Sequence, residues 1–131
     1  MVFIYQFSDH PRYAPLTHVV FELLEQKKLH SVTSTITVAE VFVEPEKKKN
    51  QIIIAEYEKV FHYLPNLEIV SVDWQLARLA SRLRATYKYL RTPDALQLAA
   101  SLLKGYVAFL TNDDKLKKID LLPIIILKNF I

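Results

Sequence analysis

Hydrophobic residues recur along most of this chain with the spacing of helices. From Pro15 onward the apolar side chains follow a period near 3.6 residues, with Glu22 and Glu25 on the other side, which predicts an amphipathic helix. The same spacing predicts further helices over 47–64, 73–88 and 92–105. The charged run 47–50 is expected to be the exposed start of the first of these.

Residues at the ends of these segments predict where the helices begin and stop. Asp73 and Thr92 carry side-chain oxygens that can cap a helix start. Pro93 suits the first helical position, where its missing N–H costs nothing, and Gly105 stands where a helix stops. Pro45 is expected to end the apolar run 36–42.

Four short segments are apolar or β-branched and are predicted to be strands. They are 30–34, 67–70, 106–110 and 122–127. The opening run Val2–Phe7 fits either a strand or the first turns of a buried helix. Because the strands alternate with helices and show no two-residue alternation, we expect an α/β fold whose parallel sheet is covered by helices on both faces.

The amino-acid composition and net charge exclude several classes of protein. A chain of 131 residues with 51% hydrophobic and 24% charged residues predicts one globular domain over 1–131. The absence of cysteine excludes disulfides and thiolate metal sites, and a single glycine excludes a glycine-rich phosphate loop. No apolar run has membrane-spanning length and no signal peptide is recognisable, so a cytoplasmic protein is expected. The net charge of +3 permits a polyanionic partner.

Three acidic residues stand out against apolar surroundings. Asp94 falls in the first turn of a helix, Asp113 follows an apolar strand, and Glu40 is the one charge in the run 36–42. Each has a plain structural explanation, since Asp94 can complement the helix dipole and Glu40 can face solvent. Sites in parallel sheets, however, form beyond the carboxyl ends of the strands, where these acids are expected to meet.

Carboxylates gathered in one place favour a metal ion. Their mutual repulsion is relieved by a hard divalent cation with oxygen ligands, for which Mg²⁺ or Mn²⁺ is suited. Such an ion can activate water and stabilise charge on a phosphate, so the predicted reaction is phosphodiester hydrolysis. The alternative is an α/β domain whose acids cap helices and bind no metal.

Three segments together resemble the PIN-domain family, of the kind found as VapC-like ribonuclease toxins in bacterial and archaeal toxin–antitoxin pairs. The segments are 34–41, 90–99 and 109–113. The resemblance implies a three-layer α/β/α fold, Mg²⁺- or Mn²⁺-dependent endoribonuclease activity, an RNA substrate, a small antitoxin partner and a homodimer. Residue by residue, Glu40, Asp94 and Asp113 match three of the family's four acids. Thr111 matches a polar residue beside them, and Asp114 is a neighbour of undetermined role.

The chain departs from this family at its start. The family opens with a central strand that ends in an Asp-Thr-Asn motif, whereas Val2–Tyr5 resembles the segment directly after that motif. The first strand is therefore expected to be missing or altered, the first Asp to be absent, and the printed chain to be nearly inactive. In a rival alignment, Val2–Phe7 is the strand and Asp9 is the fourth acid.

Basic residues are dense just ahead of Asp94. They can hold an RNA backbone or simply form a solvated helix face, and they are Arg78, Arg82, Arg84, Lys88 and Arg91. Two further function classes remain open alongside the metal-free domain. One is an active Mg²⁺-dependent endoribonuclease toxin, and the other is a catalytically inactive PIN-fold remnant that binds RNA or protein.

Overall fold

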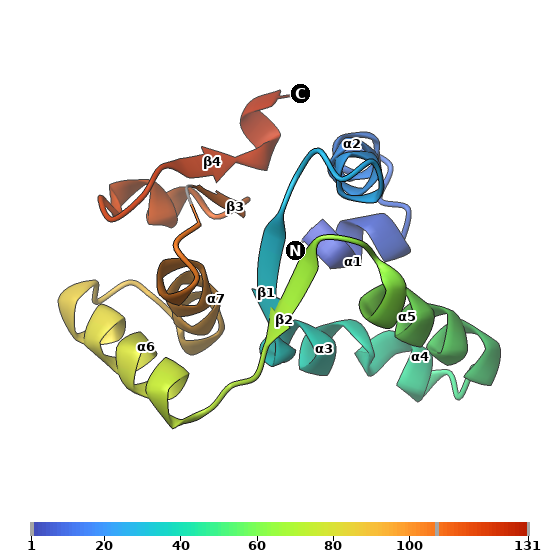
Figure 1. Cartoon of the computed structure of the whole chain (residues 1–131), viewed down its shortest axis with the longest axis horizontal. Helices are drawn as coiled ribbons and strands as arrows, with labels where there is room; N and C mark the ends of the chain where they lie inside the picture. Colours follow the sequence, from blue (N-terminus) through green and yellow to red (C-terminus); the bar gives the residue numbers. More distant parts are fainter. Residues whose placement is uncertain (1, 107, 131) are drawn as a thin grey trace.

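The computed structural model describes residues 2–106 and 108–130, which form a mixed α/β fold (Figure 1). The elements in chain order are α1 (Val2–Phe7), α2 (Ala14–Glu25), β1 (Ser31–Ser34), α3 (Thr35–Val41), α4 (Val43–Lys47), α5 (Gln51–Tyr63), β2 (Leu67–Val70), α6 (Trp74–Thr86), α7 (Thr92–Leu103), β3 (Phe109–Thr111), the 3-10 helix η1 (Asp114–Lys118), β4 (Ile124–Ile126) and the 3-10 helix η2 (Leu127–Phe130). In Figure 1, α6 and α7 lie on one side of β1 and β2 and α3 to α5 on the other, which confirms strands between helical layers.

The strands form two separate parallel pairs. In the first pair, β1 runs beside β2 with Ser31 opposite Leu67. In the second pair, β3 runs beside β4 with Phe109 opposite Ile124. Within the described residues no ladder joins β1 to β3, so parallel pairing is confirmed but the sheet is interrupted between these two strands.

The opening segment is a helix, which confirms the helical alternative for Val2–Phe7 and shows that the strand alternative was wrong. In α1, the side chains of Phe3 and Tyr5 are buried. The Ser8 N–H donates a hydrogen bond to the Ile4 carbonyl at 3.0 Å, as in a helical turn. The hydroxyl of Thr17 in α2 also donates to the Gln6 side-chain oxygen at 2.8 Å. Because Phe3 and Tyr5 lie on different sides of the helix, Phe3 contacts Phe21 of α2 and Tyr5 contacts Tyr13, whereas a strand would place both side chains on one face.

Two hydrophobic clusters make up the core. One lies around α6 and α7 and is aliphatic; its buried members are Leu76, Ala80, Leu83, Leu90, Ala95, Leu96, Leu98, Ala99, Ala100, Leu116 and Ile119. The other joins α1, α2, α3 and α5 and is largely aromatic; its buried members are Phe3, Phe21, Val41 and Phe61. The first therefore fixes α7, and the second fixes the helices beside β1 and β2.

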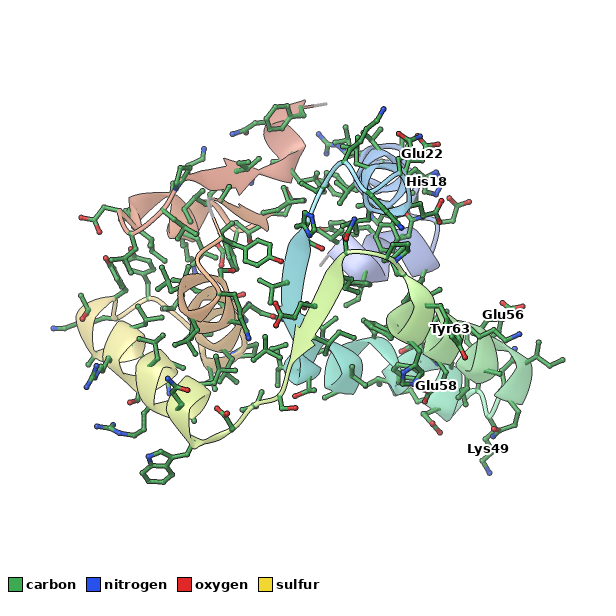
Figure 2. The ribbon with its side chains drawn as sticks, in the orientation of Figure 1. His18, Glu22, Lys49, Glu56, Glu58 and Tyr63 are labelled. Carbon is green, nitrogen blue, oxygen red and sulfur yellow. The ribbon has the colours of Figure 1, made fainter. Side chains whose placement is uncertain are left out.

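Polar side chains mark the helix starts and the outer faces. Asp73 caps α6 as expected, since its Oδ1 accepts the Leu76 N–H at 2.9 Å. Asn50 caps α5 in the same way through the Ile53 N–H at 3.2 Å. Figure 2 shows the outward-facing side chains on α2 and α5, among them His18, Glu22, Glu56, Glu58 and Tyr63, as the amphipathic patterns predicted.

Three expected helix boundaries need correction. Thr92 is not a cap, because the Ala95 N–H bonds the Arg91 carbonyl at 2.9 Å and α7 already includes Thr92. The run 47–50 does not begin a helix either, because Lys47 ends α4 and Asn50 caps α5. Pro45 does not end helical structure, since it lies in the first turn of α4, where proline is tolerated.

The predicted strand over 106–110 is shorter and lies later in the chain. Gly105 has a φ of 69° and Tyr106 donates its N–H to the Ser101 carbonyl at 3.0 Å, so Tyr106 still belongs to the end of α7. Val107 lies outside the described residues. The strand itself is Phe109–Thr111. In the described part of the chain, no helix has the length and apolarity needed to cross a bilayer.

Candidate functional site

Asp94 lies in the first turn of α7 and is half-buried. Burial raises the pKa of its carboxyl group above the usual value of 3.8, and the nearby Arg91 guanidinium opposes that rise. The Asp113 carboxylate raises the Asp94 pKa further. The two acids are therefore close enough to interact, although α7 and β3 bring them from different elements.

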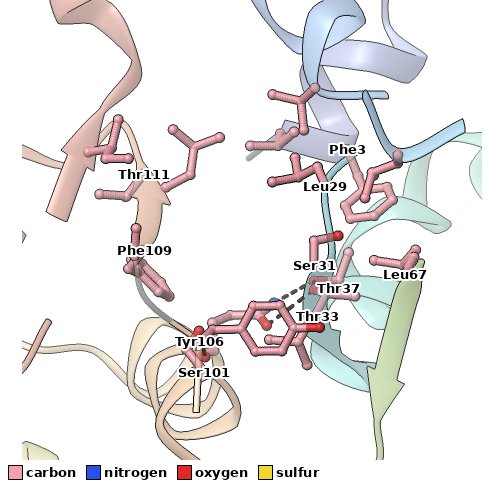
Figure 3. Close-up of a pocket in the computed structure, with 18 of the residues that line it drawn as sticks. Phe3, Leu29, Ser31, Thr33, Thr37, Leu67, Ser101, Tyr106, Phe109 and Thr111 are labelled. Atoms are coloured by element: carbon pink, nitrogen blue, oxygen red, sulfur yellow. Dashed lines mark hydrogen bonds between the residues drawn. The ribbon is translucent and has the colours of Figure 1, made fainter. Parts of the chain in front are cut away.

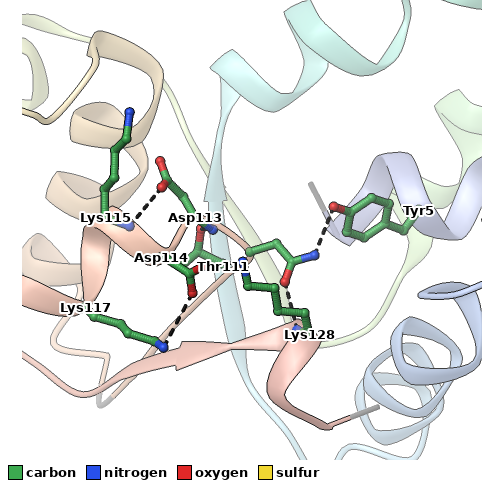
Figure 4. A network of polar contacts seen from close by, with 8 residues as sticks. Tyr5, Thr111, Asp113, Asp114, Lys115, Lys117 and Lys128 are labelled. Atoms are coloured by element: carbon green, nitrogen blue, oxygen red, sulfur yellow. Dashed lines mark hydrogen bonds and ion pairs between the residues drawn. The ribbon is translucent and has the colours of Figure 1, made fainter.

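Asp113 lies in the turn that follows β3. The buried Thr111 hydroxyl accepts the Asp113 N–H at 3.2 Å, and Asp113 Oδ1 accepts the Lys115 N–H at 3.0 Å (Figure 4). The second contact makes Asp113 the N-cap of η1. These bonds fix the orientation of the Asp113 carboxyl group and leave its other oxygen available.

The neighbouring Asp114 is occupied by two lysines. Its Oδ2 pairs with Lys128 Nζ, and its Oδ1 lies 3.4 Å from Lys117 Nζ (Figure 4). The hydrogen bond from Lys128 is the main reason that the pKa of Asp114 is lowered. Both carboxylate oxygens thus serve ion pairs at the protein surface.

Asn112 ties the same turn to both ends of the fold. Its Nδ2 donates to the Tyr5 hydroxyl of α1 at 3.2 Å, and its Oδ1 accepts the Lys128 N–H at 2.8 Å. The turn that carries Asp113 is therefore braced by α1 on one side and by η2 on the other.

Glu40 and Asp9 lie at exposed positions. Glu40 is on α3 and Asp9 follows α1 in a turn with a φ of 50°. In the ranges 2–106 and 108–130, no group of three or more Asp, Glu or His side chains is placed to hold a metal ion. Among the described residues, the charge of Asp113 contributes to the raised pKa of Asp94, and neither Glu40 nor Asp9 does so.

A buried polar network, which the sequence did not predict, connects α7 to β1. Gln97 Oε1 accepts the Ser34 N–H at 3.0 Å and the Ser34 hydroxyl at 3.1 Å. Gln97 Nε2 donates to the Thr37 hydroxyl, which also bonds Thr33 Oγ1 at 2.7 Å. The available signal was a lone polar side chain in the apolar run of α7, one turn after Asp94.

The five basic candidates lie on α6 and on the connection to α7, and all are exposed. Arg78 Nη1 donates to Ser81 Oγ at 3.0 Å. Among the described residues, none of the five forms a salt bridge with a carboxylate within 4.0 Å. Their charges therefore remain available for a polyanion, as they also would on a solvated helix face.

The chemistry of the site suits a hard cation more than a soft one. Asp94 and Asp113 offer carboxylate oxygens, and their mutual interaction would be relieved by a positive ion between them. The two carboxylates would supply part of a ligand set for Mg²⁺ or Mn²⁺, which usually retain several waters. A third protein ligand would have to come from a side chain that now faces elsewhere.

Comparison with known proteins points to one family. The family model of the PIN domain matches residues 2–122. A chain in the crystal structure of VapBC2 from Rickettsia felis bound to a DNA fragment from their promoter has a TM-score of 0.67 and 22% identity, over 95% of this chain and 92% of that chain. A chain in a toxin-antitoxin complex from Klebsiella pneumoniae has a TM-score of 0.54 and 24% identity, over 72% and 71% respectively. Both are likenesses of fold, and no curated protein matches the sequence.

Proposed function

Because this chain belongs to the PIN-domain family, we propose that it is a metal-dependent endoribonuclease of the toxin type, formed by a single domain over 1–131. The observation that carries the proposal is the half-buried Asp94 in the first turn of α7, whose pKa is raised chiefly by burial and in smaller part by the charge of Asp113. Perturbed acids of this kind are common where catalysis requires them. The experiment that tests the proposal is metal-dependent cleavage of RNA by the purified chain.

Each acidic residue has a distinct role in this proposal. Asp94 and Asp113 hold Mg²⁺ or Mn²⁺, and Glu40 is the third acid by its match to the family motif. Thr111 is a positioning residue, because its hydroxyl accepts the Asp113 N–H. When bound, the ion supplies Lewis-acid stabilisation of phosphate charge and a lowered pKa for attacking water. Asp114 is accessory, since its ion pairs with Lys128 and Lys117 brace the turn that bears Asp113.

The proposed substrate is RNA, held through its phosphates. The exposed basic side chains named above supply the positive charge ahead of α7. If this is right, changing them together to Ala lowers the salt dependence of RNA affinity, whereas an unchanged salt slope would place the phosphate contacts elsewhere. The same change should leave the fold intact, because these side chains are all exposed.

The proposed partner is a small antitoxin protein, with a homodimer as the assembly and the cytoplasm as the compartment. Support for the antitoxin comes from the structural neighbours, one a VapBC2 structure and the other a toxin-antitoxin complex. Co-expression of this chain with a candidate antitoxin, followed by size-exclusion chromatography with light scattering, tests both the partner and the dimer.

Activity is tested by comparing the wild type with two carboxyl-to-amide variants. With Mg²⁺ present, Asp94→Asn should reduce cleavage of a labelled RNA by at least about 100-fold, because a ligand charge is lost while the shape is kept. Glu22→Gln is the matched control, since Glu22 is exposed on α2. Equal cleavage by the Asp94→Asn variant, in a preparation free of contaminating nuclease, would contradict the assigned role.

A second candidate function is a catalytically inactive PIN fold that binds RNA or protein. It is favoured by the lack of any group of three acidic or His side chains suited to a metal among the described residues. RNA binding without cleavage, unchanged by Mg²⁺ or Mn²⁺ and by Asp94→Asn, would support this function. Robust cleavage lost on Asp9→Ala would instead support Asp9 as the fourth acid.

A further inference from the structure

The single tryptophan of the chain lies on the surface. Trp74 is the first residue of α6 and is 81% exposed, the largest exposed fraction among the large apolar residues that the structure describes. Asp73, directly before it, turns its carboxylate to the Leu76 N–H at 2.9 Å, so this negative charge caps the helix. In the described ranges, cationic groups lie over the rings of Tyr13 and Tyr89 and not over Trp74. The indole of Trp74 is therefore open to a ligand from solvent.

Two arginines continue the same face of α6. Arg78 and Arg82 follow Trp74 at intervals of four residues, which places the three side chains on one side of the helix at steps of about 6 Å. All three residues are exposed. The buried side of α6 lies opposite and consists of Leu76, Ala80 and Leu83. We call Trp74, Arg78 and Arg82 the α6 stripe.

The α6 stripe begins a basic stretch that leads to the candidate site. The stretch 74–91 contains five basic residues and no acidic one. Among the described residues, neither Arg78 nor Arg82 has a carboxylate within 4.0 Å. Trp74 lies about 18 Å along the helix axis from the end of α6, where the chain turns into α7 and its first-turn Asp94 (Figure 1).

Taking the proposed ribonuclease function as its basis, we propose that the α6 stripe is a subsite for single-stranded RNA. One base stacks on the Trp74 indole, and the adjoining phosphates contact Arg78 and Arg82. Stacking on an aromatic ring accepts any base, so this subsite adds affinity without selecting a sequence. The length of α6 corresponds to about five nucleotides at the spacing of about 3.4 Å in a stacked strand. The stripe therefore holds RNA several nucleotides away from the phosphate to be cleaved.

The chemistry of the stripe favours an unpaired RNA strand over a protein surface. The core of a protein interface is depleted of charge around its aromatic anchors. Here Val72 is exposed next to Trp74 in the sequence, but the side chains that continue the stripe are the cations Arg78 and Arg82. Positive charge without a carboxylate partner complements phosphates. A duplex keeps its bases paired and stacked, so only an unpaired strand presents a base to the indole.

The test measures RNA binding in EDTA, so it does not depend on cleavage. Because Trp74 is the single tryptophan, the intrinsic fluorescence of the intact protein reports directly on its indole. The probe is an adenine oligoribonucleotide of about ten nucleotides, titrated at several salt concentrations. Saturating RNA should quench the fluorescence, because a base covers the indole. An oligonucleotide of the same length without bases should still bind through its phosphates, and it should leave the fluorescence unquenched.

Substitutions separate stacking from charge, with affinity measured by the anisotropy of labelled RNA. Trp74→Ala should weaken binding at least about fivefold and leave the salt slope unchanged, because stacking releases no counterions. Trp74→Phe should recover part of this loss. Arg78→Ala and Arg82→Ala should each lower the salt slope by about 0.7, as expected for one lost phosphate contact on a single strand. Tyr63→Ala is the matched control, because Tyr63 is 79% exposed on α5, and it should bind as the wild type does.

Several results would overturn the subsite. One is wild-type affinity of Trp74→Ala, confirmed as folded by circular dichroism, and another is equal quenching by the oligonucleotide without bases. Quenching that rises with protein concentration in the absence of RNA would assign Trp74 to contacts between copies of this chain. Failure of the nuclease proposal is distinct, because quenching by RNA without any cleavage in Mg²⁺ would contradict that proposal while supporting the subsite.

Discussion

The two hydrophobic clusters differ in how completely they enclose their side chains. Around α7, Leu76 and Leu98 are 0% and 1% exposed, and aliphatic neighbours surround them. In the aromatic cluster, Phe3 stacks on Phe61 with ring centroids 5.0 Å apart and meets Phe21 edge-on at 5.3 Å. Yet Phe3 also lines a cavity of about 440 Å³ between α1 and β3 (Figure 3). One cluster is therefore closed, and the other borders open space.

The comparison indicates that the aliphatic cluster around α6 and α7 is the more rigid part of the molecule, and we call this cluster the frame. Asp94 begins a helix whose buried face belongs to the closed aliphatic cluster, so its backbone position is well supported. Polar contacts also cross between the two halves of the fold, among them Gln97 of α7 with Ser34 of β1 and Asn112 with Tyr5 of α1. Substitutions in the frame, in a link and in the aromatic cluster should have distinct consequences.

The largest effect is expected for Leu98→Ala in the closed cluster. Loss of this fully buried side chain should lower the free energy of unfolding by about 3 kcal/mol, because close packing leaves a cavity that cannot easily collapse. Urea unfolding followed by circular dichroism measures the change. Leu103→Ala on the same helix is the control, since Leu103 is 39% exposed, and a similar loss there would show that burial does not govern the difference.

The next effect is expected for the link between the clusters. Gln97→Ala removes the acceptor of the Ser34 N–H and hydroxyl and should lower the free energy of unfolding by about 2 kcal/mol, because buried polar groups lose their partners. The Ser34 amide should also exchange faster with solvent. Gln75→Ala on the exposed face of α6 is the control. Unchanged exchange at Ser34 would mean that the link does not hold β1.

A smaller effect is expected for Phe3→Leu in the aromatic cluster. The variant keeps an apolar side chain and loses three ring contacts, with Phe7, Phe21 and Phe61, which should lower the free energy of unfolding by about 1 kcal/mol. The adjoining cavity lets neighbours rearrange, so the loss should remain below that of Leu98→Ala. Thermal unfolding of both variants under one set of conditions compares them. A larger loss of stability for Phe3→Leu than for Leu98→Ala would contradict the conclusion that the aliphatic cluster is closed and the aromatic cluster is open.

The smallest effect on stability, and of opposite sign, is expected for Asp94→Asn. Burial raises the pKa of folded Asp94 above 3.8, so its stabilising contribution is complete below that pH and is lost as pH rises through the folded pKa. At pH 7 the variant should therefore be slightly more stable than the wild type, by less than about 1 kcal/mol. Thermal unfolding at pH 7 and at pH 3 measures the difference, which should vanish at the lower pH. A less stable variant at pH 7 would show that the carboxylate is favourably held.

Much of the fold follows from local pattern, whereas the site depends on distant contacts. The helical spacing and the Asp73 cap predicted α5 and α6 closely, because amphipathic faces and caps are properties of neighbouring residues. The identity of the opening helix α1 remained open, since six apolar residues carry no decisive period. Pairing within the sheet was predicted as parallel and a missing or altered first strand was expected; in the described residues the strands form two parallel pairs with no ladder between β1 and β3.

For the site, the sequence singled out Asp94 and Asp113, since an acid at a helix start and an acid after a strand are local features, and their shared metal-binding role stays a prediction. It did not predict the role of Gln97, because a glutamine in a helix has no pattern that reveals a partner 63 residues away. The part played by Glu40 stays a prediction. Its exposed position on α3 follows from the helical phase, whereas its ligand role comes only from resemblance.

The bracing of the Asp113 turn determines when during folding this site can form. Asn112 contacts Tyr5, 107 residues earlier in the chain, and Lys128, 16 residues later. Contacts between such distant positions require closure of nearly the whole chain and therefore form after local helices. A nascent chain emerging from the ribosome could complete α1 to α7 well before this turn is secured. The acidic pair would then be among the last parts of the molecule to reach its final arrangement, after Lys128 has been synthesised.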